Sequence, residues 1–395
     1  MSFFKRGFPA HRAGSSIDMP STAEQDLQSR GRSKRSFSKP LVILFAIASL
    51  IIFLLGLWWS LEPKSFSVGD AISEYSGVNL TGSVSVANPE EQAAATSADG
   101  SNASLKSAPR MTAVLNLPKG VATTSTILKL GDILLGKPGG YLSNDKVPPG
   151  IYLDNIPNWE FGVLVQLRDA TKALREVHSR SQTQSKENPY LVLAEPQLNT
   201  NSDKWMFPRA EGEYQEGFDA LEDYLKAIVD TADTGSQFYS RADNLRYWLR
   251  TVESRLGSLS QLLSASVGKK RLNTDLAGDP RARQTTQGEE EKTVKTPWLE
   301  IDDNFYYARG SSYALLHLLK ATAIDFSEVL ANKNAAVSLQ QIIRELEATQ
   351  DTIYSPIILN GSGFGFVTNH SLIMASYISR ANAGIIELRE LLAKG

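Results

Sequence analysis

Hydrophobic residues fall into two patterns along the chain, one continuous run near the start and a series of helical stripes after it. The continuous run, LVILFAIASLIIFLLGLWWS, covers residues 41–60 and contains no charged residue. A helix of that length spans about 30 Å, the thickness of the hydrocarbon core of a bilayer. Trp58 and Trp59 lie near its end, and indole rings favour the headgroup layer. The run predicts a transmembrane helix rather than a cleaved signal peptide, whose apolar core is shorter and ends in small residues.

The later hydrophobic residues recur with the period of an α-helix. Apolar positions three and four apart form stripes, and charged residues fall largely on the other faces. The stripes cover residues 124–136, 158–180, 214–228, 238–263, 305–330, 337–349 and 372–392. Strand-like alternation is nearly absent, although the short apolar runs 189–196 and 355–361 fit strands or irregular core segments. The pattern predicts an all-α fold, a bundle of roughly six or seven helices over residues 115–395.

The clearest period lies in residues 238–263, where the steps between apolar positions alternate between four and three. Such spacing forms a seam that packs against another helix. The partner is either a helix of the same bundle, which the other amphipathic helices favour, or the same seam of a second copy, which would give a homo-oligomer.

Polar segments separate these elements. Residues 1–40 carry eight basic and three acidic side chains, and their composition predicts a disordered tail. Residues 61–114 predict a flexible stalk because much of the segment is rich in Ala, Ser, Asn and Gly. Residues 272–297 predict a mobile loop.

The charge of the tail predicts the orientation of the chain in the membrane. Basic segments next to a span stay in the cytoplasm, so we expect the N-terminus there and residues 115–395 in the periplasm. The sequence thus predicts a single-pass protein of the bacterial inner membrane, with the lipid bilayer as the partner of residues 41–60.

Composition argues against several classes of function. The chain has no cysteine, so disulfides, thiolate nucleophiles and cysteine-based metal sites are absent. A net charge of −2 gives no basic field for nucleic acid. Three of the four histidines follow the apolar run, without the spacing of a metal-binding pair. We therefore expect neither a metal nor a cofactor.

Acidic residues are the candidates for catalysis. Asp302 and Asp303 lie in one aromatic-rich segment, and Asp154 and Glu160 lie in another. Two carboxylates roughly 5–10 Å apart across a cleft would suit glycoside hydrolysis, and neighbouring aromatic rings would suit sugar stacking. The alternative is that these residues favour the starts of helices by capping and by their charge. Motifs of a serine nucleophile are missing.

A glycine-rich stretch, LNGSGFGFVTNHS at residues 359–371, is the candidate for ligand binding. Backbone amides in such a loop can hold an anion or a sugar. The candidate residues are Asn360, Gly361, Gly363, Gly365, Asn369 and His370. The pattern has neither the lysine of a phosphate-binding loop nor dinucleotide-binding spacing. The alternative is a connection between two helices, in which glycines permit tight turns.

Several long strings in fixed order resemble one protein family. They are residues 137–169, 238–249, 255–279, 294–321 and 355–392. They are similar to the uncharacterised proteobacterial inner-membrane proteins called domain of unknown function 2333. The resemblance covers most of the chain from the apolar run onward. It implies a membrane-anchored protein without an assigned activity and provides no catalytic residues.

Two functions are compatible with this sequence. The first is a non-enzymatic interaction or scaffold protein of the cell envelope, in which an anchored helical domain binds envelope proteins. The second is an envelope hydrolase or a protein that binds a glycan or anionic ligand, which would use Asp302, Asp303 and the glycine-rich stretch. The incomplete catalytic motifs favour the first.

Overall fold

The computed structural model of the chain describes residues 39–77, 117–181, 186–230, 235–272 and 291–394. By its internal contacts the chain divides into two compact units, residues 1–51 and 52–395. The described residues form 11 α-helices and a single two-stranded sheet. This confirms the all-α fold, with more helices than the hydrophobic stripes indicate because several are too short to show a period.

The apolar run forms helix α2 (Lys39–Trp59), which crosses the boundary between the two units. Its segment Pro40–Trp59 has a mean hydropathy of 2.9, and none of it is buried within the chain. A core helix of equal hydrophobicity would bury its side chains. By length and composition α2 can cross a membrane.

Helices make up most of the larger unit after α2. They are α3 (Val68–Ser76), α5 (Val121–Gly136), α6 (Asn155–Ala173), α7 (Pro189–Leu198), α8 (Ala210–Val229), α9 (Ala242–Ser264), α10 (Ile301–Asp325), α11 (Ser327–Asn332), α12 (Ala336–Ala348) and α13 (His370–Ala393). A π-helical turn, Leu174–His178, continues α6. The hairpin β1 (Lys269–Leu272) and β2 (Glu291–Val294) pairs antiparallel after α9.

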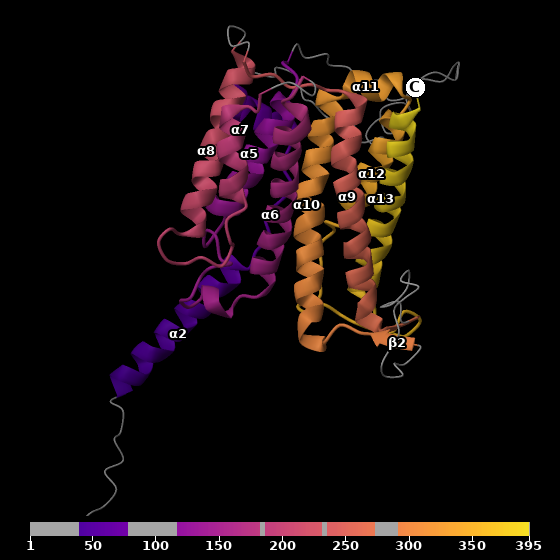
Figure 1. Cartoon of the computed structure of the whole chain (residues 1–395). Helices are drawn as coiled ribbons and strands as arrows, with labels where there is room; N and C mark the ends of the chain where they lie inside the picture. The colour runs from indigo at the N-terminus through magenta and orange to yellow at the C-terminus, as the bar shows by residue number, and fades with distance from the viewer. Residues whose placement is uncertain (1–38, 78–116, 182–185, 231–234, 273–290, 395) are drawn as a thin grey trace, which may run out of the picture. The chain divides into compact units, whose positions relative to one another are not determined.

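Helix α10 is the central helix of this unit. It packs against α5, α6, α9, α12 and α13, and it runs between α6 and α9 in Figure 1. Glycines let α6 and α10 touch backbone to backbone, because a Cβ at Gly310 would overlap the carbonyl of Trp159 and a Cβ at Gly162 would overlap that of Tyr307. Most side chains of α10 are therefore buried.

Helix α9 uses its apolar seam inside the chain. The seam residues are buried along the whole helix, and they are Leu245, Leu249, Val252, Leu256, Leu259 and Leu263. The main neighbour of α9 is α13, which lies beside it in Figure 1. The structure thus provides the helix partner within the same chain that the seam requires.

Three expectations about segments need correction, and they concern the stalk, the mobile loop and the apolar run 189–196. A flexible stalk from residue 61 is wrong for residues 61–77, since Val68, Ala71 and Ile72 of α3 are buried against the domain. The rest of that stalk, like residues 273–290 of the expected mobile loop, lies outside the described residues. The ends of that loop, however, form the strands β1 and β2.

The apolar run 189–196 is helical and forms most of α7. Asn188 accepts hydrogen bonds from the backbone amides of Tyr190 and Leu191, and Pro189 occupies the first helical position. Both features favour a helix start, and they outweigh the short, strand-like apolar pattern.

Candidate functional site

The segment directly after α2 is built into the helical domain. Residues 61–67, here called the linker segment, are irregular and lie against α10. The Nε of Arg309 donates to Oε2 of Glu62 at 2.6 Å, and the hydroxyl of Tyr313 donates to the carbonyl of Lys64 at 2.8 Å. The backbone amide of Phe66 donates to Nε2 of His317 at 3.1 Å. The contacts advance together, so the linker segment runs along α10 in the same direction.

Arg309, Tyr313 and His317 are four residues apart and therefore share one face of α10. We call these three residues the clamp face. The rings of Phe66 and His317 stack with centroids 4.0 Å apart and an interplanar angle of 10°. The clamp face thus supplies a partner for one amide and one carbonyl of the linker segment, whose residues are exposed or half-buried.

Buried groups of the clamp face are hydrogen-bonded. Arg309 also donates to the backbone carbonyls of Thr349 and Gln350, at 2.9 and 3.2 Å. Nδ1 of His317 lies 2.8 Å from the carbonyl of Tyr313. That nitrogen must therefore carry the proton, which leaves Nε2 as the acceptor for Phe66. Burial lowers the pKa of His317 to about 4, which keeps the ring neutral.

The sequence contained a signal for the clamp face. In RGSSYALLHLLK, residues 309–320, three polar or amphipathic side chains recur every four positions within an apolar helix. Such a stripe indicates that a polar group packs there, because buried donors and acceptors require partners. The partner is a backbone segment far away in the sequence, which no local pattern identifies.

The first candidate acids lie where α6 and α10 begin. Asp154 caps α6 and accepts from the backbone amide of Asn155 at 2.9 Å. Asp302 and Asp303 lie in the first turn of α10, and Asp303 accepts from the side-chain amide of Asn158 at 2.7 Å. Burial, followed by the charges of Asp302 and Asp154, raises the pKa of Asp303. The structure therefore brings these three acids to one place, each at a helix start.

Glu160, the fourth candidate acid, is fully buried and saturated with hydrogen bonds. Its carboxylate accepts from Nζ of Lys137, from the backbone amides of Leu142 and Ser143 at 2.8 Å each, and from the Ser143 hydroxyl at 2.5 Å. Burial raises the pKa of Glu160 and lowers that of Lys137, against the attraction between the two charges. The pair fixes the turn after α5 onto α6.

The glycine-rich stretch closes on itself between α12 and α13. Asn369 caps α13 by accepting from the amide of Leu372 at 2.8 Å, and its side chain donates to Asn360 at 2.6 Å. Nδ1 of His370 accepts from the backbone amide of Leu359 at 3.2 Å. These bonds join the two ends of the loop, as expected for a connection between helices.

Glycines in this loop serve its closure. The amide of Gly361 donates to the carbonyl of Thr368 at 3.1 Å, and that of Gly365 donates to the carbonyl of Ser362 at 2.8 Å. A Cβ at Gly361 would overlap the backbone of Val367, and one at Gly363 would lie 3.3 Å from the side chain of Leu372. The amides of Gly361 and Gly365 are thus used within the loop.

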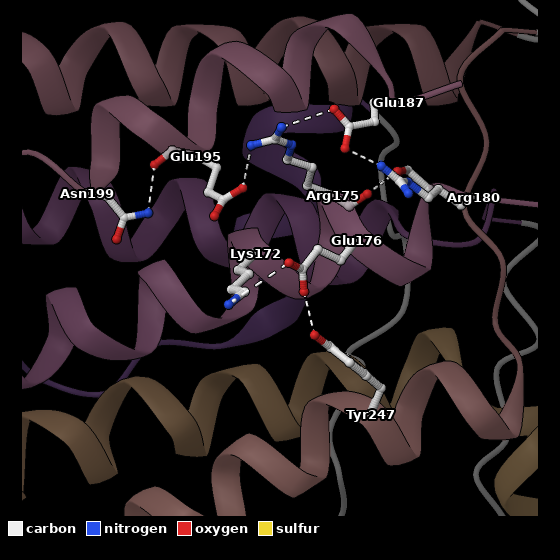
Figure 2. A network of polar contacts seen from close by, with 9 residues as sticks. Lys172, Arg175, Glu176, Arg180, Glu187, Glu195, Asn199 and Tyr247 are labelled. Atoms are coloured by element: carbon white, nitrogen blue, oxygen red, sulfur yellow. Dashed lines mark hydrogen bonds and ion pairs between the residues drawn. The ribbon is translucent and has the colours of Figure 1, made fainter. Parts of the chain in front are cut away.

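A polar network joins α6, α7 and α9 (Figure 2). Arg175 contacts Glu195 at 2.7 Å and Glu187 at 3.0 Å, and Glu187 also pairs with Arg180. On the other side of the π-helical turn, Glu176 accepts from the hydroxyl of Tyr247 and pairs with Lys172. Three cations and three carboxylates balance one another here. The network holds helices together and has no excess charge for a ligand.

Buried His178 in the same turn has an apolar environment. Its ring stacks on Phe238 with centroids 5.1 Å apart and meets Phe326 edge-on. Burial lowers its pKa to about 3. Within the described residues, no three His, Asp or Glu side chains gather as metal ligands would.

Fold and sites define an all-α protein with an apolar helix leading into a helical domain. The chain belongs to a bacterial family whose description is "uncharacterized protein conserved in bacteria" (DUF2333), and the family model matches residues 32–395. This confirms the resemblance noted from the sequence. No curated protein and no solved structure matches the chain.

Proposed function

We propose that the chain is a single-span protein of the bacterial inner membrane whose periplasmic helical domain is a scaffold for envelope proteins. The hold of the clamp face on the linker segment carries this proposal. A domain on a long flexible stalk samples many positions, whereas this domain begins within a few residues of Trp59. Such a fixed attachment to the membrane helix suits a protein that positions partners at a constant distance from the membrane.

The hydrogen bonding of the candidate acids supports a scaffold over an enzyme. A general acid must exchange its proton with a substrate within hydrogen-bond reach. Glu160 is buried and occupied by its own chain, and Asp154 caps a helix. These roles explain both residues without a reaction.

One observation favours the alternative, an envelope hydrolase or a protein that binds glycan or anionic ligands. The raised pKa of Asp303 beside Asp302 and Asp154 is the property of a general acid. The rings of Phe305 and His370 lie 6.4 Å apart, so the glycine-rich loop is near the start of α10. If this function holds, Asp303→Asn abolishes release of fragments from envelope glycan, and Asp219→Asn, at an exposed position of α8, does not.

Membrane topology is tested by cysteine labelling, which the cysteine-free chain permits without a background. Val337 is 65% exposed and suits a probe of the domain, and Ser33 lies in the basic tail. In cells with a permeabilised outer membrane, an impermeant maleimide is expected to label Val337→Cys at once and Ser33→Cys only after lysis. The opposite pattern would place the domain in the cytoplasm and refute the proposal.

The scaffold role is tested by photocrosslinking in living cells. A photoreactive residue at Val337 or Leu193, both exposed, is expected to give the same envelope protein in independent preparations. The comparison is the same residue at buried Leu249, which should crosslink only within the chain. If exposed and buried positions give indistinguishable profiles, the scaffold role is refuted.

A further inference from the structure

Large apolar side chains are exposed on loops and turns of the helical domain. The segments are 147–152, 205–207, 298–299 and 364–367, here called the apolar rim. Phe207, Phe364 and Phe366 are 95%, 109% and 111% exposed, and Trp298 and Leu299 are 77% and 75% exposed. Single exposed apolar residues are ordinary, but large apolar side chains exposed together on several neighbouring segments indicate an interaction site.

Contacts place the four segments of the apolar rim at one end of the domain. Asn144 donates to the carbonyl of Lys204 at 2.7 Å, which joins the segments 147–152 and 205–207. The amide of Thr296 and the side chain of Asn360 both donate to the end of α9, at the carbonyls of Ala265 and Ser266. The segments 298–299 and 364–367 therefore adjoin the same helix end, at the bottom of the domain in Figure 1.

The same end receives the chain from α2. A Cβ at Gly56 would lie 3.6 Å from the side chain of Pro149, and one at Gly139 would lie 2.7 Å from the ring of Trp59. The linker segment then enters beside Arg309, in the third turn of α10, and continues toward the middle of the helix. These contacts hold the segment 147–152 of the apolar rim close to the last turn of α2.

We infer that the apolar rim lies in the headgroup layer of the bilayer that α2 crosses, so that the domain is docked on the lipid surface. The inference rests on the proposed function in one respect, that α2 spans the membrane. Tryptophan and tyrosine, present in the rim as Tyr152, Trp205 and Trp298, favour this layer, because the apolar ring is buried while the hydroxyl or indole N–H stays wet.

The form of the rim favours lipid over a protein partner. Its apolar residues project from four separate segments, and a fluid layer accommodates separate projections without a matching surface. Exposed Lys146, Lys204 and Lys295 precede three of the segments and can meet anionic headgroups. Asp203 and Glu300 offset part of that charge, so the apolar side chains carry the interaction.

The test uses the full chain in phospholipid vesicles with an environment-sensitive nitrobenzoxadiazole label on single cysteines. Phe364→Cys reports on the rim, Val337→Cys reports on the start of α12, and Leu50→Cys reports on α2. Lys320 pairs with Glu347 and Arg309 bonds to Thr349, so α12 runs opposite to α10 and begins at the end away from the rim. Spin-labelled lipids quench each label according to its depth.

Four outcomes are distinguishable. The inference predicts that shallow spin labels remove most of the emission at position 364, that deep ones do so at position 50, and that neither affects position 337. Quenching at 50 but not at 364 overturns the docked rim and leaves the span intact. If the label at position 364 is protected from aqueous iodide but is not quenched by spin-labelled lipids, a protein partner or a second copy covers the rim. This result also overturns the docked rim. Absence of quenching at 50 refutes the span itself.

Discussion

Acid is expected to weaken the hold of the clamp face on the linker segment through His317. The neutral ring accepts the amide of Phe66, and a protonated ring cannot. The ring of His317 is buried beside Phe66 and Tyr313. This burial and the nearby charge of Lys320 lower the pKa of His317 from 6.5 to about 4. The unfolded chain therefore binds a proton as the pH falls below 6.5, whereas the folded chain binds it only near pH 4.

The size of the effect follows from linkage. Stability from His317 is fully present above pH 6.5, is lost as the pH falls toward 4, and changes no further below that. Between pH 7 and pH 5 the loss is about 2 kcal/mol, for a folded pKa of about 4. For a domain of this size the same loss lowers the melting temperature by about 5 °C.

The assay compares the pH dependence of the native chain with that of His317→Gln. Glutamine can accept the amide of Phe66 but does not titrate, so its variant should lose about 5 °C less than the native chain between pH 7 and pH 5. Circular dichroism of the full chain in detergent follows the melting. His370→Gln is the control for the loss of a histidine elsewhere in the domain. His370 is less buried than His317, and burial lowers its pKa in the same direction.

Hydrogen exchange gives a local measurement of the same effect. The protection of the Phe66 amide relative to its intrinsic exchange rate should be lower at pH 5 than at pH 7, and His317→Gln should remove this difference. Equal pH dependence of the native chain and His317→Gln, in melting and in exchange, would refute the reasoning.

Further predictions concern the packing of the domain. Lys137→Met leaves the buried carboxylate of Glu160 without its cation and should cost about 3–5 kcal/mol in thermal unfolding, and Glu160→Met added to it should restore part of the loss. Gly310→Ala forces a Cβ into the backbone of α6 and should prevent stable folding, whereas Gly212→Ala, which meets open space on α8, should stabilise by about 0.5–1 kcal/mol. Asn369→Ala removes the cap of α13 and should cost about 1–2 kcal/mol.

Sequence patterns predicted the long helices better than the short elements around them. The heptad steps of α9 correspond to buried leucines, and the stripe over residues 372–392 corresponds to α13. Helix α3 has only Val68, Ala71 and Ile72 on its buried face. A stripe of that length does not rise above chance beside a segment rich in Ala, Ser and Gly.

Residues at the candidate sites show why local patterns were ambiguous. Aspartate before a helix serves equally as a cap and as a catalytic acid, and Asp154 is a cap in the structure. Glu160 was ambiguous for another reason, because its partner Lys137 lies at the end of another helix. Pairings between distant segments depend on the packing of α5, α6 and α10, which no single segment encodes.

Polar residues within α10 determine where the chain enters the domain. An apolar replacement of the clamp face would pack against the other helices equally well, but it would leave the carbonyl of Lys64 and the amide of Phe66 without partners. The adjoining side of α10 is fixed against α6 by Gly162 and Gly310. One helix therefore contacts the linker segment and the core on neighbouring sides. A displacement of the linker segment along α10 would break its hydrogen bonds in sequence, so the end of α2 and the helical core must move together.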